Sequence, residues 1–333
     1  MSVTIRDVAR EAKVSVATVS RALNGHHNVT EAMRQRVQAV AERLQYAPHQ
    51  AARSLSSRRT HTIGVVLPDL HGEFFSELMR GIDQVARARG LHLLVSSYHG
   101  RPQEQGAALR GMRGRVDGLL LMSPFRDAEG HLAQALTPAV PTVLINTHAQ
   151  HGGPRAVAVD NYAGARAMVE HLVARGCRRI AFIAGPDDNF DAGERLRGYR
   201  DGLHALLPRA QPCVVQGDFD EASGERAGQE LLAATQRPDA VFAANDMMAL
   251  GCLLAFNEAG VRVPADIALA GFDDIPLARH VHPSLTSMRV DIAELGAQAM
   301  RLLLAGPQEA PAPPQPASPR LVERASTAST DTS

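Results

Sequence analysis

The first 44 residues contain three segments whose apolar positions recur every three or four residues, the spacing of a helix with one buried face. The first segment begins at Thr4 and the second at Ser15, and both residues can cap a helix. The third segment covers residues 30–44. Because helices this short bury little alone, they must pack together, and residues 4–24 predict a helix-turn-helix.

From Thr62 onward, apolar runs of strand length alternate with amphipathic helices. Strands are predicted at 63–67, 92–97, 116–122, 142–145, 180–184, 214–216, 240–243, 267–271 and 321–324. Helices are predicted at 74–89, 103–113, 161–175, 192–206, 221–234, 247–259 and 291–304. This alternation predicts an α/β body of doubly wound parallel sheets, and its repetition predicts two similar lobes.

The connector between these parts, residues 48–61, has room for only two helical turns, between His49 and Ser56. Pro48 disfavours helix at the residue before it but suits the first turn of a new helix. A helix of two turns is marginal in water. The composition by itself therefore favours a flexible linker over a helix that forms only when docked.

The charge is divided unevenly along the chain. Residues 1–61 hold ten basic and four acidic side chains, a net charge of +6, whereas the whole chain holds 35 of each and is neutral. The remaining residues therefore carry a net charge of −6. A basic helical head on an acidic body is typical of a protein that binds the phosphate backbone of nucleic acid.

The composition excludes several other classes of protein. Hydrophobic residues make up 45% of the chain without a long uninterrupted run, and charges interrupt the first 20 positions. We therefore expect a cytoplasmic globular protein without a membrane span or export signal, and its three cysteines to be reduced core thiols. With no phosphate loop, no G-x-S-x-G motif and no cysteine–histidine cluster, we expect no catalytic residue, cofactor or metal.

Four motifs in the head are specific in combination: TIRDVAREAKVSVATVSRALNG at residues 4–25, V-T-x-x-x-R-x-x-V at 29–37, LQYAP at 44–48 and ARSL at 52–55. Together they resemble the head of the lactose-repressor (LacI) family, whose looser landmarks continue to about residue 326. The resemblance implies a hinge helix that pairs across a dimer and a two-lobed body like that of periplasmic binding proteins. No leucine-zipper tail of the kind that makes the lactose repressor a tetramer follows, so we expect a dimer.

The domain boundaries expected on this basis are a helix-turn-helix domain at 1–47, a hinge helix or linker at 48–61, an effector-binding and dimerisation body at 62–327 and a disordered tail at 328–333. Lobe 1 is expected at about 62–160 and 291–320, and lobe 2 at about 161–290 and 321–327. Residues 308–319, rich in proline and alanine, predict a mobile connector. The polar residues from 325 to the end predict disorder.

The resemblance implies that the second helix lies in the major groove of DNA, where Val16, Ala17 and Arg21 reach base edges. Arg21 can make a bidentate contact with guanine, whereas the other two offer only apolar contact, for instance to a thymine methyl group. Leu55 in the hinge is expected to wedge between base pairs in the minor groove and kink the duplex. Phosphate contacts, which fix register without reading sequence, are expected from Thr4, Ser15, Thr18, Ser20, Asn24 and Thr30.

Polar and aromatic side chains follow the predicted strands, at the sheet edge where doubly wound proteins bind ligands. Carboxylates, amides and an arginine suit the hydroxyl groups of a carbohydrate, and aromatic rings suit its apolar face. Each of these residues also has a structural alternative, namely a helix cap, a turn or the core. The candidate effector-binding residues, most of them supported by position in the family, are Asp69, Phe74, Asp191, Arg195, Phe219, Asn245 and Asp273.

Asn189 and Asp191 stand where the purine-binding branch of the family has an arginine and a threonine, so a purine is poorly provided for. A sugar, or a sugar phosphate neutralised by Arg195, is favoured, although the acidic residues nearby disfavour strongly anionic effectors. Asp160 matches another family position, and an N-cap for the following helix explains it equally well.

These features predict a dimeric transcriptional repressor that binds a pseudo-palindromic operator and releases it when a carbohydrate closes the cleft. Co-repression, in which the ligand strengthens DNA binding, uses the same parts, and the sequence does not distinguish the two. A solute-binding protein would fit the body alone, but it has no use for a basic helix-turn-helix.

Overall fold

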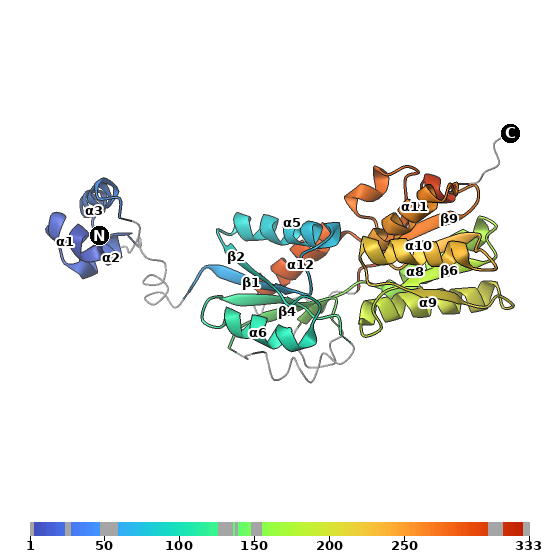
Figure 1. Ribbon diagram of the computed structural model, residues 1–333. Helices are drawn as coiled ribbons and strands as arrows, with labels where there is room; N and C mark the ends of the chain where they lie inside the picture. Colours follow the sequence, from blue (N-terminus) through green and yellow to red (C-terminus); the bar gives the residue numbers. More distant parts are fainter. Residues whose placement is uncertain are drawn as a thin grey trace. The chain divides into compact units, whose positions relative to one another are not determined.

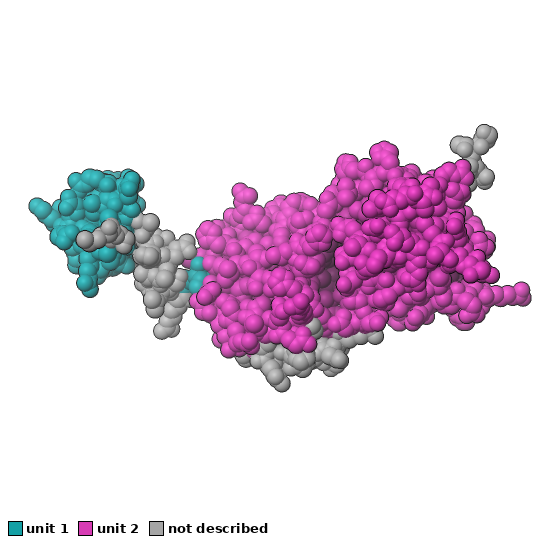
Figure 2. Space-filling model, viewed as in Figure 1, with its two compact units in different colours: residues 1–60 teal, residues 61–333 magenta. Residues whose placement is uncertain are grey.

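The computed structural model describes residues 3–23, 28–46, 59–125, 136, 139–147, 155–305 and 316–328. The chain forms two compact units, Met1–Thr60 and His61–Ser333 (Figure 2). Asn24 and Leu55, two of the expected DNA contacts, lie outside the described residues. Among the helices within those residues, none is long and apolar enough to cross a membrane.

The first unit contains the three predicted helices, α1 (Ile5–Glu11), α2 (Val16–Leu23) and α3 (Glu31–Arg43). At the start of α1, the backbone N–H and the hydroxyl of Thr4 donate to the Asp7 carboxylate at 3.0 and 2.7 Å. The Ser15 hydroxyl accepts from the backbone N–H of Thr18 at 3.1 Å, so it caps α2 as predicted. One residue from each helix, Val8, Val19 and Val37, is fully buried in the small core between them.

The first lobe of the second unit is built on a parallel five-stranded sheet of order β2-β1-β3-β4-β5. Its strands are β1 (Thr62–Leu67), β2 (His92–Ser97), β3 (Gly118–Met122), β4 (Thr142–Ile145) and β5 (Arg155–Val157). Its helices are α5 (Glu73–Ala88), α6 (Pro102–Met112) and α12 (Ile292–Leu304). Figure 1 shows α5 and α12 side by side. Their backbones are in close contact at Gly81, where an added Cβ would lie only 1.8 Å from the Ala293 carbonyl oxygen.

The second lobe is built on a six-stranded sheet of order β11-β10-β9-β8-β6-β7, in which only β11 is antiparallel to its neighbour. Its strands are β6 (Ile180–Ala184), β7 (Cys213–Gln216), β8 (Ala240–Ala243), β9 (Ala268–Asp273), β10 (Thr286–Arg289) and β11 (Arg320–Val322). Its helices are α8 (Asn161–Ala174), α9 (Phe190–Leu206), α10 (Glu221–Ala233) and α11 (Asp246–Glu258). Two 3₁₀ helices follow strands of this sheet, η1 (Pro276–Arg279) after β9 and η2 (Ala325–Thr327) after β11.

Two strands, β5 and β10, were not among the predicted elements. The sequence of β10 is TSMR, which looks polar, yet Thr286 and Ser287 are fully buried. Their hydroxyl groups are satisfied by distant partners: Thr286 bonds to Thr327 at 2.8 Å, and Ser287 donates to Asp246 at 2.7 Å. A buried strand can therefore be polar where its hydrogen bonds are supplied from elsewhere in the chain.

The prediction of disorder from residue 325 is wrong for residues 325–327, which form η2. Ser326 and Thr327 are buried, and the Ser326 hydroxyl donates to the Leu269 carbonyl oxygen of β9 at 2.6 Å. The prediction that all three cysteines lie in the core is also wrong, because Cys213, at the start of β7, is exposed. In the predicted connector, Ala317 pairs with Val159, and residues 306–315 lie outside the described residues.

Candidate functional site

The carboxyl ends of the parallel strands in both lobes border one cavity of about 460 Å³. Figure 2 shows a hollow in the surface of the second unit. All seven candidate effector-binding residues line this cavity, namely Asp69, Phe74, Asp191, Arg195, Phe219, Asn245 and Asp273. The volume suits a small molecule of the size of a mono- or disaccharide.

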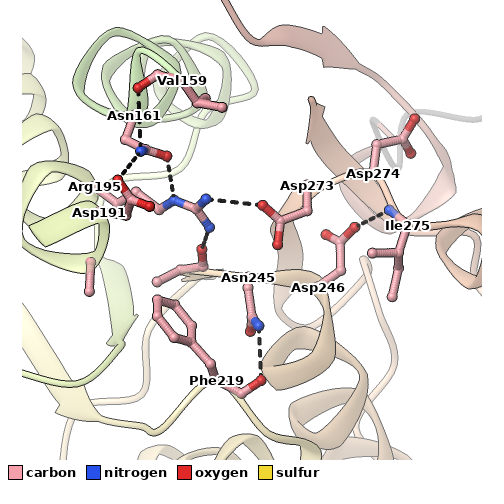
Figure 3. Close-up of polar contacts among 12 residues, drawn as sticks. Val159, Asn161, Asp191, Arg195, Phe219, Asn245, Asp246, Asp273, Asp274 and Ile275 are labelled. Carbon is pink, nitrogen blue, oxygen red and sulfur yellow. Dashed lines mark hydrogen bonds and ion pairs between the residues drawn. The ribbon is translucent and has the colours of Figure 1, made fainter. Parts of the chain in front are cut away.

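Arg195 of α9 is the centre of the polar contacts in this cavity, and only 4% of it is exposed (Figure 3). Its Nε donates to Asn161 Oδ1 at 2.8 Å, and its Nη1 donates to the Ala244 carbonyl oxygen at 2.6 Å. Its Nη2 donates to Asp273 Oδ1 at 3.0 Å, and its guanidinium carbon lies 3.8 Å from the centre of the Phe272 ring. The guanidinium is thus held in place by four groups before any ligand arrives.

Asn161, the first residue of α8, is a site residue that the sequence did not indicate. Its Nδ2 donates to Asp191 Oδ1 at 2.9 Å, so it joins Asp191 to Arg195 in one buried network. The neighbouring Asp160, which the sequence did single out, accepts from the backbone N–H of Ala163 at 3.0 Å and caps α8. The capping alternative therefore accounts for Asp160.

The buried network contains more acid than base. Burial raises the pKa of Asp191 to about 7, against the attraction of Arg195. Burial also raises the pKa of Asp273 to about 6, although Arg195 lies within hydrogen-bonding distance. Two carboxyl groups that share one guanidinium in a low dielectric cannot both be fully compensated, so both titrate close to neutral pH.

Asp246 and Asp274, which also follow strands, have structural roles. Asp246 is fully buried and accepts from the Ser287 hydroxyl and, at 2.9 Å, from the backbone N–H of Ile275. Burial raises its pKa well above the usual range. Asp274 forms ion pairs with Arg289 and Arg324, each at 2.6 Å. Neither carboxylate lines the cavity.

The loop after β7 is fixed by Asn245, the N-cap of α11. Asn245 Nδ2 donates to the Phe219 carbonyl oxygen at 2.9 Å, while its Oδ1 accepts from the backbone N–H of Met248 at 3.0 Å. Phe219 has a positive φ of 65°. Asn245 therefore holds the Phe219 backbone in this strained conformation, and the Phe219 ring in the wall of the cavity.

Backbone strain is concentrated around the cavity. Among the described residues other than glycine, eight have a positive φ, and four of the eight line the cavity: His99, Asn146, Phe219 and Asp273. Such conformations persist only where the surroundings enforce them, and they cluster at functional sites. Asn146 was not indicated by the sequence, because the residues next to β4 give no sign of a left-handed backbone.

Several contacts join the lobes at the edge of the cavity, among them the backbone N–H of Phe190, which donates to the Pro124 carbonyl oxygen at 2.6 Å beside the Phe125–Asn189 bridge. His71, in the loop after β1, lies 3.2 Å from Glu221 at the start of α10, and this hydrogen bond raises the pKa of His71. Glu73 at the start of α5 accepts from the backbone N–H of Leu277 in η1 at 2.8 Å. The same loop and helix supply Asp69 and Phe74 to the cavity wall.

In the first unit, α2 has one buried face and one exposed face. Val19 and Ala22 pack into the core, whereas Val16, Ala17 and Arg21 are exposed. Arg21 Nε donates to the Ala17 carbonyl oxygen at 3.2 Å, and its Nη1 and Nη2 groups have no partner among the described residues. These two groups of Arg21 could therefore donate to a guanine base. Of the expected phosphate contacts on this unit, Thr4, Ser15 and Thr30 are exposed, and Thr18 and Ser20 are half-buried.

Two family models match the chain. Residues 4–49 match the model of bacterial regulatory proteins of the lacI family, and residues 169–327 match that of a periplasmic binding protein-like domain. The HTH-type transcriptional regulator GalR of Salmonella typhimurium is 38% identical over 335 aligned positions, which cover 99% of this chain and 97% of that protein. Catabolite control protein A of Priestia megaterium is 36% identical, with coverage of 91% and 92%. The ribose operon repressor of Escherichia coli is 37% identical, with coverage of 90% and 92%.

Solved structures agree with this assignment over nearly the whole chain. A dimer of the lac repressor bound to operator and the anti-inducer ONPF superposes with a TM-score of 0.87 and 32% identity, covering 98% of this chain and 99% of that one. The regulator CelR in complex with cellobiose has a TM-score of 0.68 and 32% identity, with coverage of 97% and 99%. The chain belongs to the lacI family of regulatory proteins and is a DNA-binding transcriptional regulator, not an enzyme.

Proposed function

We propose that this regulator is a repressor that binds a pseudo-palindromic operator as a homodimer and releases it when a small carbohydrate fills the cavity. The observation that carries the proposal is the buried Arg195–Asp273 pair, which opens onto a cavity of about 460 Å³ in a chain that also presents an exposed α2 face. Such a regulator works where its operator lies, in the cytoplasm and at the nucleoid.

Each of the seven candidate effector-binding residues has a role in this proposal. Arg195, Asp191 and Asp273 supply hydrogen-bonding groups for sugar hydroxyls, while Phe74 and Phe219 supply flat faces for the apolar side of the ring. Asn245 fixes the loop that carries Phe219. Asp69 belongs to the first lobe, so a ligand that contacts it together with Arg195 bridges the two lobes.

On DNA, Arg21 is the main base reader of α2, and Val16 and Ala17 contribute apolar contacts. Specificity then depends on the symmetry and spacing of two half-sites as well as on base contacts. Thr4, Ser15, Thr18, Ser20, Asn24 and Thr30 are proposed to hold the phosphate backbone, and Leu55 to wedge the minor groove at the centre of the site.

The alternative to induction is co-repression, in which the ligand strengthens operator binding. One observation keeps this alternative in view: the lac repressor structure described above holds operator and an anti-inducer at the same time. A ligand shifts the equilibrium between two states only as far as it prefers one of them. Whether it weakens or strengthens operator binding therefore depends on which arrangement of the lobes it favours.

The test is an operator-binding assay with the full-length chain. Selection from random DNA should return an inverted repeat, and fluorescence anisotropy should then show that a carbohydrate changes the affinity for it. Arg195→Ala should keep operator binding and lose the response to the sugar. A selected site without symmetry would contradict the dimeric mode of binding, and a full response in Arg195→Ala would move the effector site elsewhere.

A further inference from the structure

The cavity wall is strongly acidic. Six carboxylates line it, namely Asp69, Asp188, Asp191, Asp218, Asp220 and Asp273. Within the described residues, Arg195 is the only lysine or arginine in the wall, and it is already paired with Asp273. Of the two histidines in the wall, His71 is paired with Glu221. An excess of negative charge therefore faces whatever fills this space.

Three of these carboxylates lie near one another on the two loops that follow β6 and β7. Burial raises the pKa of Asp218, and repulsion from Asp220 and Asp188 raises it further, while Arg226 of α10 opposes the rise. None of the three forms an ion pair in the described part of the chain. Asp188 and Asp218 are exposed and Asp220 is half-buried, and like charges gathered at one place repel one another unless a cation joins them.

The hydrogen-bonding groups of the wall show the same bias toward acceptors. Three of the five N–H groups of Arg195 already donate to protein oxygens, and its charge is paired with Asp273, so this arginine is poorly placed to neutralise a phosphate. Asn146 also lines the cavity, is only 2% exposed, and has an Oδ1 without a hydrogen-bond partner. A buried acceptor without a partner is unfavourable, so a ligand that brings donors is favoured.

The apolar part of the wall fits the same kind of ligand. Phe74, Phe125 and Phe219 line the cavity beside the carboxylates. An aromatic face attracts an ammonium group as well as the apolar face of a sugar ring. Two groups of the wall that could attract an anion, Arg195 and His71, are already paired with carboxylates.

From this geometry, and resting on the proposed effector function of the cavity, we propose that the effector is a polyhydroxylated amine. Its ammonium group lies among Asp188, Asp218 and Asp220, and its hydroxyl groups reach Arg195 and Asn146. Sugar phosphates and sugar acids are excluded by the same carboxylates. The class includes amino sugars and their ring-nitrogen analogues.

The test compares ligands that differ in one substituent. Isothermal titration calorimetry with the full-length protein at pH 7 would measure glucosamine, glucose, N-acetylglucosamine and glucose 6-phosphate, with the same four derivatives of galactose and mannose. Charge-assisted hydrogen bonds predict that at least one free amine binds about tenfold or more tightly than its hydroxyl and acetylated counterparts. The phosphates should not bind.

Two variants make the test specific to the proposed carboxylates. The double variant D188N/D218N should lose about tenfold in affinity for the amine and keep its affinity for any neutral sugar that binds. Asp83→Asn, on the exposed surface of α5, is the control and should bind the amine as the unmodified chain does. Thermal unfolding of both variants would show that they fold.

The outcomes separate this inference from the proposed function. A neutral or phosphorylated sugar that binds as tightly as its amine, and changes operator affinity, overturns the inference and leaves the proposed function standing. An amine that binds as expected without changing operator affinity supports the inference and contradicts the proposed function. If no member of the panel binds, both are overturned.

Discussion

Asp273→Asn sets two large effects against each other. Removing one partner of a buried ion pair usually costs about 3–5 kcal/mol, because the other charge is left uncompensated. Yet the pKa of Asp273 is raised by burial, from 3.8 to about 6, which means that ionising this carboxyl already costs the folded state more than Arg195 returns. The relief of no longer burying an ionised carboxyl group should be larger than the loss of the ion pair, because asparagine keeps an oxygen acceptor for Arg195 without the charge.

The size and sign of the change in the free energy of unfolding follow from the pKa of Asp273. The folded state binds the proton of Asp273 more tightly than the unfolded chain does, so this stability is complete below pH 3.8 and is lost as the pH rises through about 6. A pKa raised from 3.8 to about 6 corresponds to about 3 kcal/mol. Asp273→Asn does not suffer that loss. It should therefore raise the free energy of unfolding by about 1–3 kcal/mol at pH 8 and change it little at pH 4.

Urea unfolding of the full-length chain between pH 4 and pH 8 measures this difference. Asp266→Asn is the control, because its hydrogen bonds with Arg262 lower the pKa of Asp266 to about 2 and give the opposite pH dependence. That variant should be less stable than the unmodified chain by the same amount throughout pH 4 to pH 8, because the stabilisation from Asp266 is lost only as the pH falls from 3.8 through about 2. A loss of 3 kcal/mol or more in Asp273→Asn at pH 8 would refute the reasoning, since the ion pair would then outweigh its burial.

Three other changes have clear expected outcomes. Arg21→Ala should cost about 1–3 kcal/mol at the operator and relax the preference at one base pair, as measured by anisotropy on single-base variants; an equal loss on every sequence would make it a phosphate contact. Leu55→Gly should weaken operator binding and reduce the DNA bend measured by gel-mobility phasing. An unchanged bend would contradict the proposal that Leu55 wedges between base pairs. Gly81→Ala should lower stability by about 1–3 kcal/mol or more by forcing α12 away from α5, whereas Gly111→Ala, whose Cβ meets nothing within 4 Å, should not.

The sequence was sufficient for elements whose signal is local. The three helices of the first unit, the helices of the second unit and most of its strands follow from apolar spacing. β5 and β10 do not. β5 is only three residues long, and β10 is polar because its partners, Asp246 and Thr327, are far from it in the chain. Hydrogen bonds between residues so far apart leave no pattern in the segment itself.

The same limit applies to the cavity. The rule that ligands bind beyond the carboxyl ends of strands, narrowed by the family resemblance, gathered seven residues that line one space. It could not choose between Asp160 and Asn161, because the choice depends on which side chain meets Arg195, 34 residues after Asn161. It also gave no sign of Asn146, whose importance lies in an unpaired oxygen.

The free energy that drives a ligand response must come mainly from the cavity. Two of the contacts that join the lobes at its edge, His71 with Glu221 and Glu73 with Leu277, involve exposed groups, and an exposed ion pair contributes about 0–1 kcal/mol. Moving a two-state equilibrium from nearly all one state to nearly all the other takes about 5.5 kcal/mol. Two or three charge-assisted hydrogen bonds made only when the lobes close would supply about that much. The buried network around Arg195 is already held in position, so a ligand that bridges it to Asp69 gains those bonds without first ordering the protein.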